Sequence, residues 1–152
     1  MKKLYLDLCV YNRPFDDQRQ RRIALETNLF IYLLGQIEEG IYDLFTSSVL
    51  EYENQKNPYP ERKGKILTYL SLARRKITLT SSIVERAKFL ESLGVRPIDA
   101  LHIASAEEAR VEYFITCDDS LLEKIKNLHS PIKVKVIGLL EFIGRDYLAE
   151  HL

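Results

Sequence analysis

The sequence has 152 residues, of which 46% are hydrophobic and 29% are charged, so it can bury a core beneath a well-hydrated surface. The 22 Lys and Arg residues balance the 22 Asp and Glu residues, and this zero net charge excludes a strongly basic nucleic-acid-binding protein at the level of bulk charge. No apolar run reaches the length of a membrane span and no signal-peptide pattern is present, so we expect a single cytoplasmic domain over residues 1–152.

Apolar patterning predicts that strands and helices alternate along the whole chain. Residues 3–10 form an apolar-rich run in which the first predicted strand ends near Asp7. The other predicted strands cover residues 42–47, 77–80, 111–116 and 132–137. The predicted helices cover about residues 17–39, a segment that begins at Ser48, and residues 61–73, 81–94, 97–110, 120–127 and 139–152. This alternation is typical of the α/β class, in which helices cover both faces of a mainly parallel sheet.

The segment after the second predicted strand carries two Glu residues with different expected roles. Ser48 and Glu51 have the spacing of a capping box, in which both side chains bind backbone N–H groups at a helix start. That role would occupy Glu51 structurally and leave Glu53 free. We prefer Glu53 as the Glu that faces the edge of the sheet, although the sequence leaves Glu51 open.

Acidic residues recur at the predicted carboxyl ends of strands and at helix starts. These residues are Asp7, Glu53 (or Glu51), Asp99 and Asp118. Because ligands of open α/β sheets bind outside the carboxyl ends of the strands, we expect carboxylates sent there from distant segments to converge. Converged carboxylates repel one another unless they share protons or hold a cation, and hard divalent cations take oxygen ligands. The pattern therefore predicts a Mg²⁺ or Mn²⁺ site for phosphate chemistry.

Each acidic residue also has a purely structural interpretation. Asp118 and Asp119 taken alone fit helix caps, and Asp99 in a first helical turn is favoured by the helix dipole. Asp7 is harder to explain in this way, because an ionised group inside an apolar strand is costly without a partner. Four carboxylates at one predicted edge favour a metal site over four separate caps.

Four segments together resemble the PIN-domain family, the metal-dependent nucleases that include the VapC toxins. The segments are the strand that carries Asp7 with Cys9 and Val10 after it, the spacing from Ser47 to Glu53, Asp99 before Ala-Leu-His-Ile-Ala, and Thr116-Cys-Asp118 after an apolar strand. They extend in this order from residue 4 to about residue 137. The resemblance implies a PIN-like three-layer α/β/α fold with a mainly parallel central sheet.

The resemblance also implies an activity and the residues that perform it. The residues implied to be catalytic and to hold Mg²⁺ or Mn²⁺ are Asp7, Glu53, Asp99 and Asp118. Thr116 would position Asp118, and Asp119 would be an outer-sphere ligand. The implied function is a metal-dependent endoribonuclease that hydrolyses RNA phosphodiester bonds, as the toxin of a toxin–antitoxin pair with an antitoxin partner. The alternative is a catalytically weak binding module in an RNA or protein complex.

Further expectations concern single residues outside this set. Arg13 follows the first strand closely and is our candidate for a phosphate contact. His102 lies three residues after Asp99, on the same helical face, and we expect it to be a packed helix histidine. Cys9 and Cys117 have no zinc-like spacing, and we expect two reduced thiols.

We also expect a homodimer or a complex with a partner protein, because apolar residues on two predicted helices cover wide arcs. These residues are Leu29, Phe30, Leu33 and Leu34 on the first long helix, and Ile66, Leu67, Tyr69 and Leu70 on a later one. Burial of both helices inside the domain is nearly as well supported by the sequence. The resemblance favours pairing, since PIN toxins commonly pair.

Overall fold

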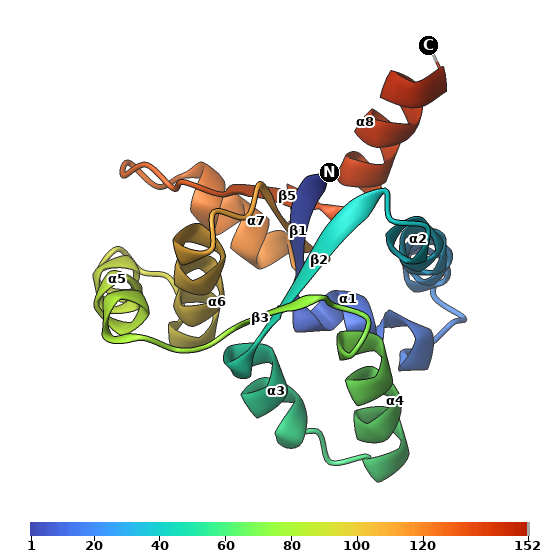
Figure 1. The fold of residues 1–152 in the computed structure, drawn as a ribbon, viewed down its shortest axis with the longest axis horizontal. Coiled ribbons are helices and arrows are strands. Elements are labelled where there is room, and N and C mark those ends of the chain that lie inside the picture. The colour runs from blue at the N-terminus through green and yellow to red at the C-terminus, as the bar shows by residue number, and fades with distance from the viewer. Residues whose placement is uncertain (152) are drawn as a thin grey trace.

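The computed structural model describes residues 1–151 and has a five-stranded sheet at its centre (Figure 1). The strands, in their order across the sheet, are β3 (Arg75–Ile77), β2 (Tyr42–Ser47), β1 (Lys2–Leu6), β4 (Tyr113–Thr116) and β5 (Lys135–Gly138). Every neighbouring pair of strands is parallel. The predicted α/β class with a mainly parallel central sheet is confirmed.

Helices cover the sheet on both faces, with α2 on one side and α5 and α6 on the other (Figure 1). The helical elements are α1 (Leu8–Asn12), the 3₁₀ helix η1 (Arg13–Phe15), α2 (Arg21–Glu38), α3 (Ser48–Gln55), α4 (Pro60–Leu70), α5 (Ser81–Ser92), α6 (Pro97–Glu108), α7 (Asp119–Lys126) and α8 (Leu139–His151). This arrangement confirms the expected three-layer architecture. The expected last residue of α8, Leu152, lies outside the described residues.

The strands that lead to Asp7 and Asp118 lie side by side at the centre of the sheet. Tyr5 on β1 is opposite Phe45 on β2 and opposite Phe114 on β4. The pairing continues one residue beyond β1, because the backbone N–H of Asp7 donates to the carbonyl oxygen of Ile115 at 2.9 Å. Both carboxyl ends therefore reach the same edge, as predicted from the βα alternation.

The first strand ends where expected, whereas the structure corrects the predicted cap of α3. The strand ends at Leu6, next to Asp7, and Asp7 caps the short helix α1. Ser47, and not Ser48, caps α3, since its hydroxyl accepts from the N–H of Leu50 at 3.0 Å. The hydroxyl of Ser48 instead accepts from the N–H of Leu79 at 3.2 Å. The capping box that we expected from Ser48 and Glu51 is therefore wrong.

The third strand begins two residues earlier and ends three residues earlier than its sequence pattern predicts. Residues 78–80 do not join the sheet, because the hydroxyl of Thr80 accepts from the N–H of Ile83 at 3.2 Å and starts α5. Arg75 begins β3, with Nε 3.3 Å from a carboxylate oxygen of Asp43 on the neighbouring strand. The helix cap at Thr80 therefore ends the strand early, although the sequence of residues 78–80 favours β structure.

The apolar arcs of α2 and α4 are used mainly inside the domain. Phe30, Leu33, Ile66 and Leu70 are buried, whereas Leu67 is 47% exposed. Helix α2 packs against α8, β2 and η1, and α4 packs against α1 and α3. These contacts account for the buried residues of both helices, and the expected homodimer stays a prediction. Among the described residues, no helix combines the length and apolar character that crossing a bilayer requires.

Candidate metal centre

Asp7 stands at the carboxyl end of the central strand and is 6% exposed. Its Oδ2 accepts from the hydroxyl of Thr116 at 2.8 Å, and its Oδ1 accepts from the N–H of Leu8 at 2.8 Å. The Sγ of Cys9 also donates to Oδ2 at 3.4 Å. The pKa of the Cys9 thiol is raised, first by its hydrogen bond with Cys117 and then by burial, so it keeps the proton that it donates. Asp7 is thus held by uncharged neighbours, and within the part of the chain that the structure describes it forms no ion pair.

Thr116 connects Asp7 to Asp118. Its hydroxyl donates to Asp7 and accepts from the N–H of Asp118 at 3.0 Å. Asp118 caps α7, since its Oδ1 accepts from the N–H groups of Ser120 at 2.9 Å and Leu121 at 3.3 Å. Oδ1 of Asp118 therefore acts as the helix cap that the structural interpretation expects. Its second carboxylate oxygen, Oδ2, does not take part in the cap.

Arg96, directly before α6, brings the second oxygen of Asp118 together with Asp99. Its guanidinium donates to Oδ2 of Asp118 at 2.7 Å and to Oδ2 of Asp99 at 3.1 Å. The charges of these two carboxylates raise the pKa of Arg96. One exposed cation therefore neutralises an acidic pair from two helices that start at the same edge of the sheet.

Asp99 lies close enough to Asp7 for the two charges to interact. The pKa of Asp99 is raised, first by burial and second by the charge of Asp7, although Arg96 opposes both effects. Two carboxyl groups whose charges repel each other are stabilised by a cation that both can contact. The repulsion between Asp99 and Asp7 is the physical sign that this edge is built for positive charge.

Glu53 on α3 completes the acidic edge and contacts His102 on α6. The Oε1 of Glu53 lies 2.8 Å from Nε2 of His102, whose side chain is fully buried. Asp7, Glu53 and His102 each offer a ligand atom within 4.8 Å of the others. The carboxylate oxygens in this group suit Mg²⁺ or Mn²⁺, and the donor set therefore fits the expected metal.

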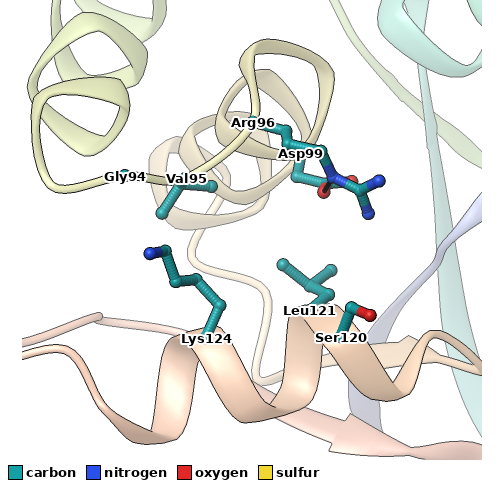
Figure 2. Close-up of a pocket in the computed structure, with 7 residues that line it drawn as sticks. All are labelled: Gly94, Val95, Arg96, Asp99, Ser120, Leu121 and Lys124. Carbon is teal, nitrogen blue, oxygen red and sulfur yellow. Dashed lines mark hydrogen bonds and ion pairs between the residues drawn. The ribbon is translucent and has the colours of Figure 1, made fainter.

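A cavity of about 180 Å³ opens beside Asp99, between α6 and α7 (Figure 2). The residues that line it are Gly94, Val95, Arg96, Asp99, Ser120, Leu121 and Lys124. Figure 2 shows Arg96 and Asp99 at the start of α6, across the cavity from the side chains of α7. This cavity next to the Asp99 carboxylate has room for the waters that Mg²⁺ usually retains.

The structure separates the two Glu residues between which the sequence left a choice. Glu51 forms an exposed ion pair with Lys76, 2.8 Å between Oε2 and Nζ. Glu53, in contrast, lies with Asp7 and His102. The alternation along α3 thus places only Glu53 in the acidic group found among the described residues.

Two residues near the site have ion-pair partners that the sequence did not indicate. Arg13 donates through Nε to Glu26 at 2.8 Å and through Nη1 to Asp16 at 2.8 Å, and its expected phosphate contact stays a prediction. Asp119 is paired with Arg22, whose Nη2 lies 2.7 Å from Oδ1, and this pairing lowers the pKa of Asp119.

Sequence reasoning missed the role of Arg96 and underrated that of His102. Arg96 stands three residues before Asp99 at a helix start, and this spacing alone brings the two side chains together. His102 is packed, as expected, but it also touches Glu53, 49 residues earlier in the chain. No local signal in the sequence connects these two residues.

Comparison with known proteins gives one family and a common fold. The model of a family described as PIN domain matches residues 23–128, a range that includes Glu53, Asp99 and Asp118 but not Asp7. No match was found among curated proteins.

Three solved structures share the fold at low sequence identity. FitAcB from Neisseria gonorrhoeae is 14% identical, with a TM-score of 0.58 over 90% of this chain and 98% of that one. VapBC2 from Rickettsia felis, bound to a DNA fragment from its promoter, is 15% identical, with a TM-score of 0.55 over 90% and 98%. VapBC-5 from Mycobacterium tuberculosis, of the VapBC family of toxin–antitoxin systems, is 16% identical, with a TM-score of 0.52 over 91% and 99%.

Proposed function

This chain belongs to the PIN-domain family, and from that membership and its acidic edge we propose that it is a metal-dependent endoribonuclease that hydrolyses RNA phosphodiester bonds. The observation that carries the proposal is the convergence of Asp7 and Glu53, from the end of β1 and from α3, within 4.8 Å. Asp99 extends this group, because the charge of Asp7 raises its pKa. Carboxylates that repel one another at a strand edge are the ligands expected for Mg²⁺ or Mn²⁺.

In this proposal the ion is held by Asp7, Glu53 and Asp99, with Asp118 beside them. A divalent ion in such a site lowers the pKa of bound water and stabilises the oxygens that attack and leave the phosphorus. Thr116 holds one oxygen of Asp7 by donating its hydroxyl proton, and it accepts from the backbone of Asp118. The Thr116 hydroxyl thereby fixes one carboxylate oxygen of Asp7 and the backbone of Asp118 before the substrate binds.

We propose that the chain acts as the toxin of a toxin–antitoxin pair, with an antitoxin protein as its partner. The support is the shared fold with VapBC-5, a member of a family of toxin–antitoxin systems. A homodimer and a cytoplasmic location belong to the same proposal. A small protein encoded next to this chain that co-purifies with it and suppresses its nuclease activity would support the antitoxin assignment.

One observation favours the second candidate, a catalytically weak binding module. Arg96 already neutralises Asp99 and Asp118, and such an internal cation opposes the binding of a metal. The two candidates differ in whether Mn²⁺ can displace this guanidinium at concentrations that support cleavage.

The test is cleavage of a mixed single-stranded RNA by the purified protein with Mn²⁺ or Mg²⁺, with EDTA as the metal-free reference. We expect metal-dependent cleavage by the wild type and none by Asp7→Asn. Metal binding without cleavage would favour the binding module, and absence of both would reject the proposed function.

A further inference from the structure

A row of buried hydrogen bonds runs from the start of α3 through the centre of the sheet to Glu53. The hydroxyl of Ser47 accepts from the N–H of Leu50 at 3.0 Å and lies 2.6 Å from the hydroxyl of Tyr5. The Tyr5 hydroxyl lies 2.5 Å from Nδ1 of His102, whose Nε2 lies 2.8 Å from Oε1 of Glu53. Ser47, Tyr5 and His102 are each fully buried. The residues of this row are called the Ser47–Tyr5–His102 chain below.

The direction of the hydrogen bonds in the Ser47–Tyr5–His102 chain follows from counting protons. The Glu53 carboxylate can only accept, so Nε2 of His102 must carry a hydrogen, and in the neutral imidazole Nδ1 then offers its lone pair. The Tyr5 hydroxyl then donates to Nδ1, and the Ser47 hydroxyl donates to Tyr5 while accepting from Leu50. Burial raises the pKa of Tyr5 well above its usual value, so the phenol keeps the proton that it donates. Every donor in the chain is then used once.

The opposite direction leaves groups unsatisfied. If Nδ1 of His102 carried the hydrogen, Tyr5 would donate to Ser47, and the Ser47 proton would have no acceptor among the contacts of the described residues. The lone pair of Nε2 would also face the carboxylate of Glu53, which is repulsive in a site without bulk water. A buried hydroxyl proton without an acceptor destabilises the structure, so the first direction is preferred.

We infer that His102 is a positioning residue: the Ser47–Tyr5–His102 chain fixes its neutral Nε2–H tautomer, and this N–H holds the Glu53 carboxylate toward the metal site. The inference rests on the proposed metal site. It excludes His102 as a metal ligand, because Nδ1 is bound to Tyr5 and Nε2 is bound to Glu53. One oxygen of Glu53 is held by the imidazole, and Oε2 is left to the cation.

The first test reads the tautomer directly, in the metal-free protein. Long-range ¹H–¹⁵N NMR spectra of the imidazole rings distinguish Nε2–H from Nδ1–H, and we expect the Nε2–H form for His102. Mn²⁺ is then added, and electron spin echo spectra report whether nitrogen is bound to the ion. We expect no nitrogen ligand, and a ¹⁴N coupling lost in His102→Gln would overturn the inference.

The second test breaks the chain at a distance from Glu53. Tyr5→Phe removes the donor to Nδ1, and we expect Mn²⁺ affinity to fall about 10- to 100-fold, as for other partners that orient a metal ligand. Tyr11→Phe is the matched control, since Tyr11 is also fully buried but its hydroxyl has no hydrogen-bond partner among the described residues. Equal Mn²⁺ affinities of the two folded variants would overturn the inference while leaving the proposed function intact.

A further pair of variants keeps the inference testable if Tyr5→Phe does not fold. His102→Gln retains an N–H donor that can reach Glu53, whereas His102→Leu does not. We expect His102→Gln to bind Mn²⁺ more tightly than His102→Leu, and the reverse order or equality would contradict positioning through an N–H. If the wild type does not bind Mn²⁺, the proposed function is rejected together with the inference. If the wild type binds Mn²⁺ but the variants do not behave as expected, only the inference is rejected.

Discussion

Replacing Arg96 with Gln should tighten the binding of Mn²⁺, because the guanidinium and the metal compete for the same two carboxylates. In the structure Arg96 donates to Asp118 at 2.7 Å and to Asp99 at 3.1 Å. An ion that binds Asp99 must either displace this side chain or share the carboxylate with it. Gln is close to Arg in polarity but carries no charge, so Arg96→Gln removes the competing cation.

The size of the effect follows from the exposure of the ion pairs. The side chain of Arg96 is 64% exposed, and those of Asp99 and Asp118 are 10% and 29% exposed. Ion pairs with an exposed partner contribute about 0.2–1 kcal/mol each, so loss of both removes about 0.4–2 kcal/mol of competition. At 1.4 kcal/mol for each factor of ten, Mn²⁺ affinity should rise about 2- to 30-fold. The gain should shrink in 1 M salt, where charges at this surface are screened.

The assay is a Mn²⁺ titration of the free protein followed by electron paramagnetic resonance or calorimetry at low and high salt. Lys124→Gln is the matched control, because Lys124 lines the same cavity but has no ion pair with either carboxylate among the described contacts. We expect a smaller change for the control. Unchanged or weaker Mn²⁺ binding by Arg96→Gln would refute the competition and indicate that the guanidinium instead holds the carboxylates in place for the ion.

Three further predictions concern the carboxylates themselves. Asp7→Asn should lower Mn²⁺-dependent RNA cleavage at least about 100-fold, the upper range for perturbing a metal site, with an unchanged circular dichroism spectrum; cleavage at the wild-type rate would remove Asp7 from the site. Asp99→Asn should raise the free energy of unfolding at pH 7. The raised pKa of Asp99 means that its ionised form destabilises the folded protein at pH values above 3.8, the usual pKa of the group. This gain should vanish below that pH, and urea unfolding at pH 7 and pH 3 measures it; a loss of stability at pH 7 would contradict the sign. Glu53→Gln should weaken Mn²⁺ binding more than Glu51→Gln does, and a titration giving the opposite order would transfer the role to Glu51.

The sequence alone determined the class of fold and the edge at which the acidic residues meet. Strands and helices alternate with different periods of apolar residues, and this periodicity reports local burial directly. Parallel strands joined by helices must place all their carboxyl ends at one edge, so Asp7 and Asp118 could be assigned to that edge before any contact was known. Pro97 likewise marked a helix start that the structure confirms, because proline at a first helical position costs no hydrogen bond.

The residues at which strands and helices begin and end depended on tertiary contacts, which a local sequence pattern does not show. Ser47 and Ser48 are chemically identical caps, and the choice between them was made by the pairing of β2 with β3, which extends to Ser47 and Ile77. Ser48 was then bound to the segment after β3, 31 residues further along the chain. The cap of α3 was therefore decided by contacts between segments that are distant in the sequence.

Only the tertiary structure decided which partners the site residues have. The sequence did not indicate ion-pair partners for Arg13, and folding placed it beside Glu26 and Asp16. Tyr5 looked like an ordinary apolar strand residue, and its hydroxyl acquired a function in our inference only because α6 packs His102 onto β1. Local periodicity specifies which side chains are buried, but the partner that a buried polar group finds depends on how distant elements pack, since each such group must be satisfied where it lies.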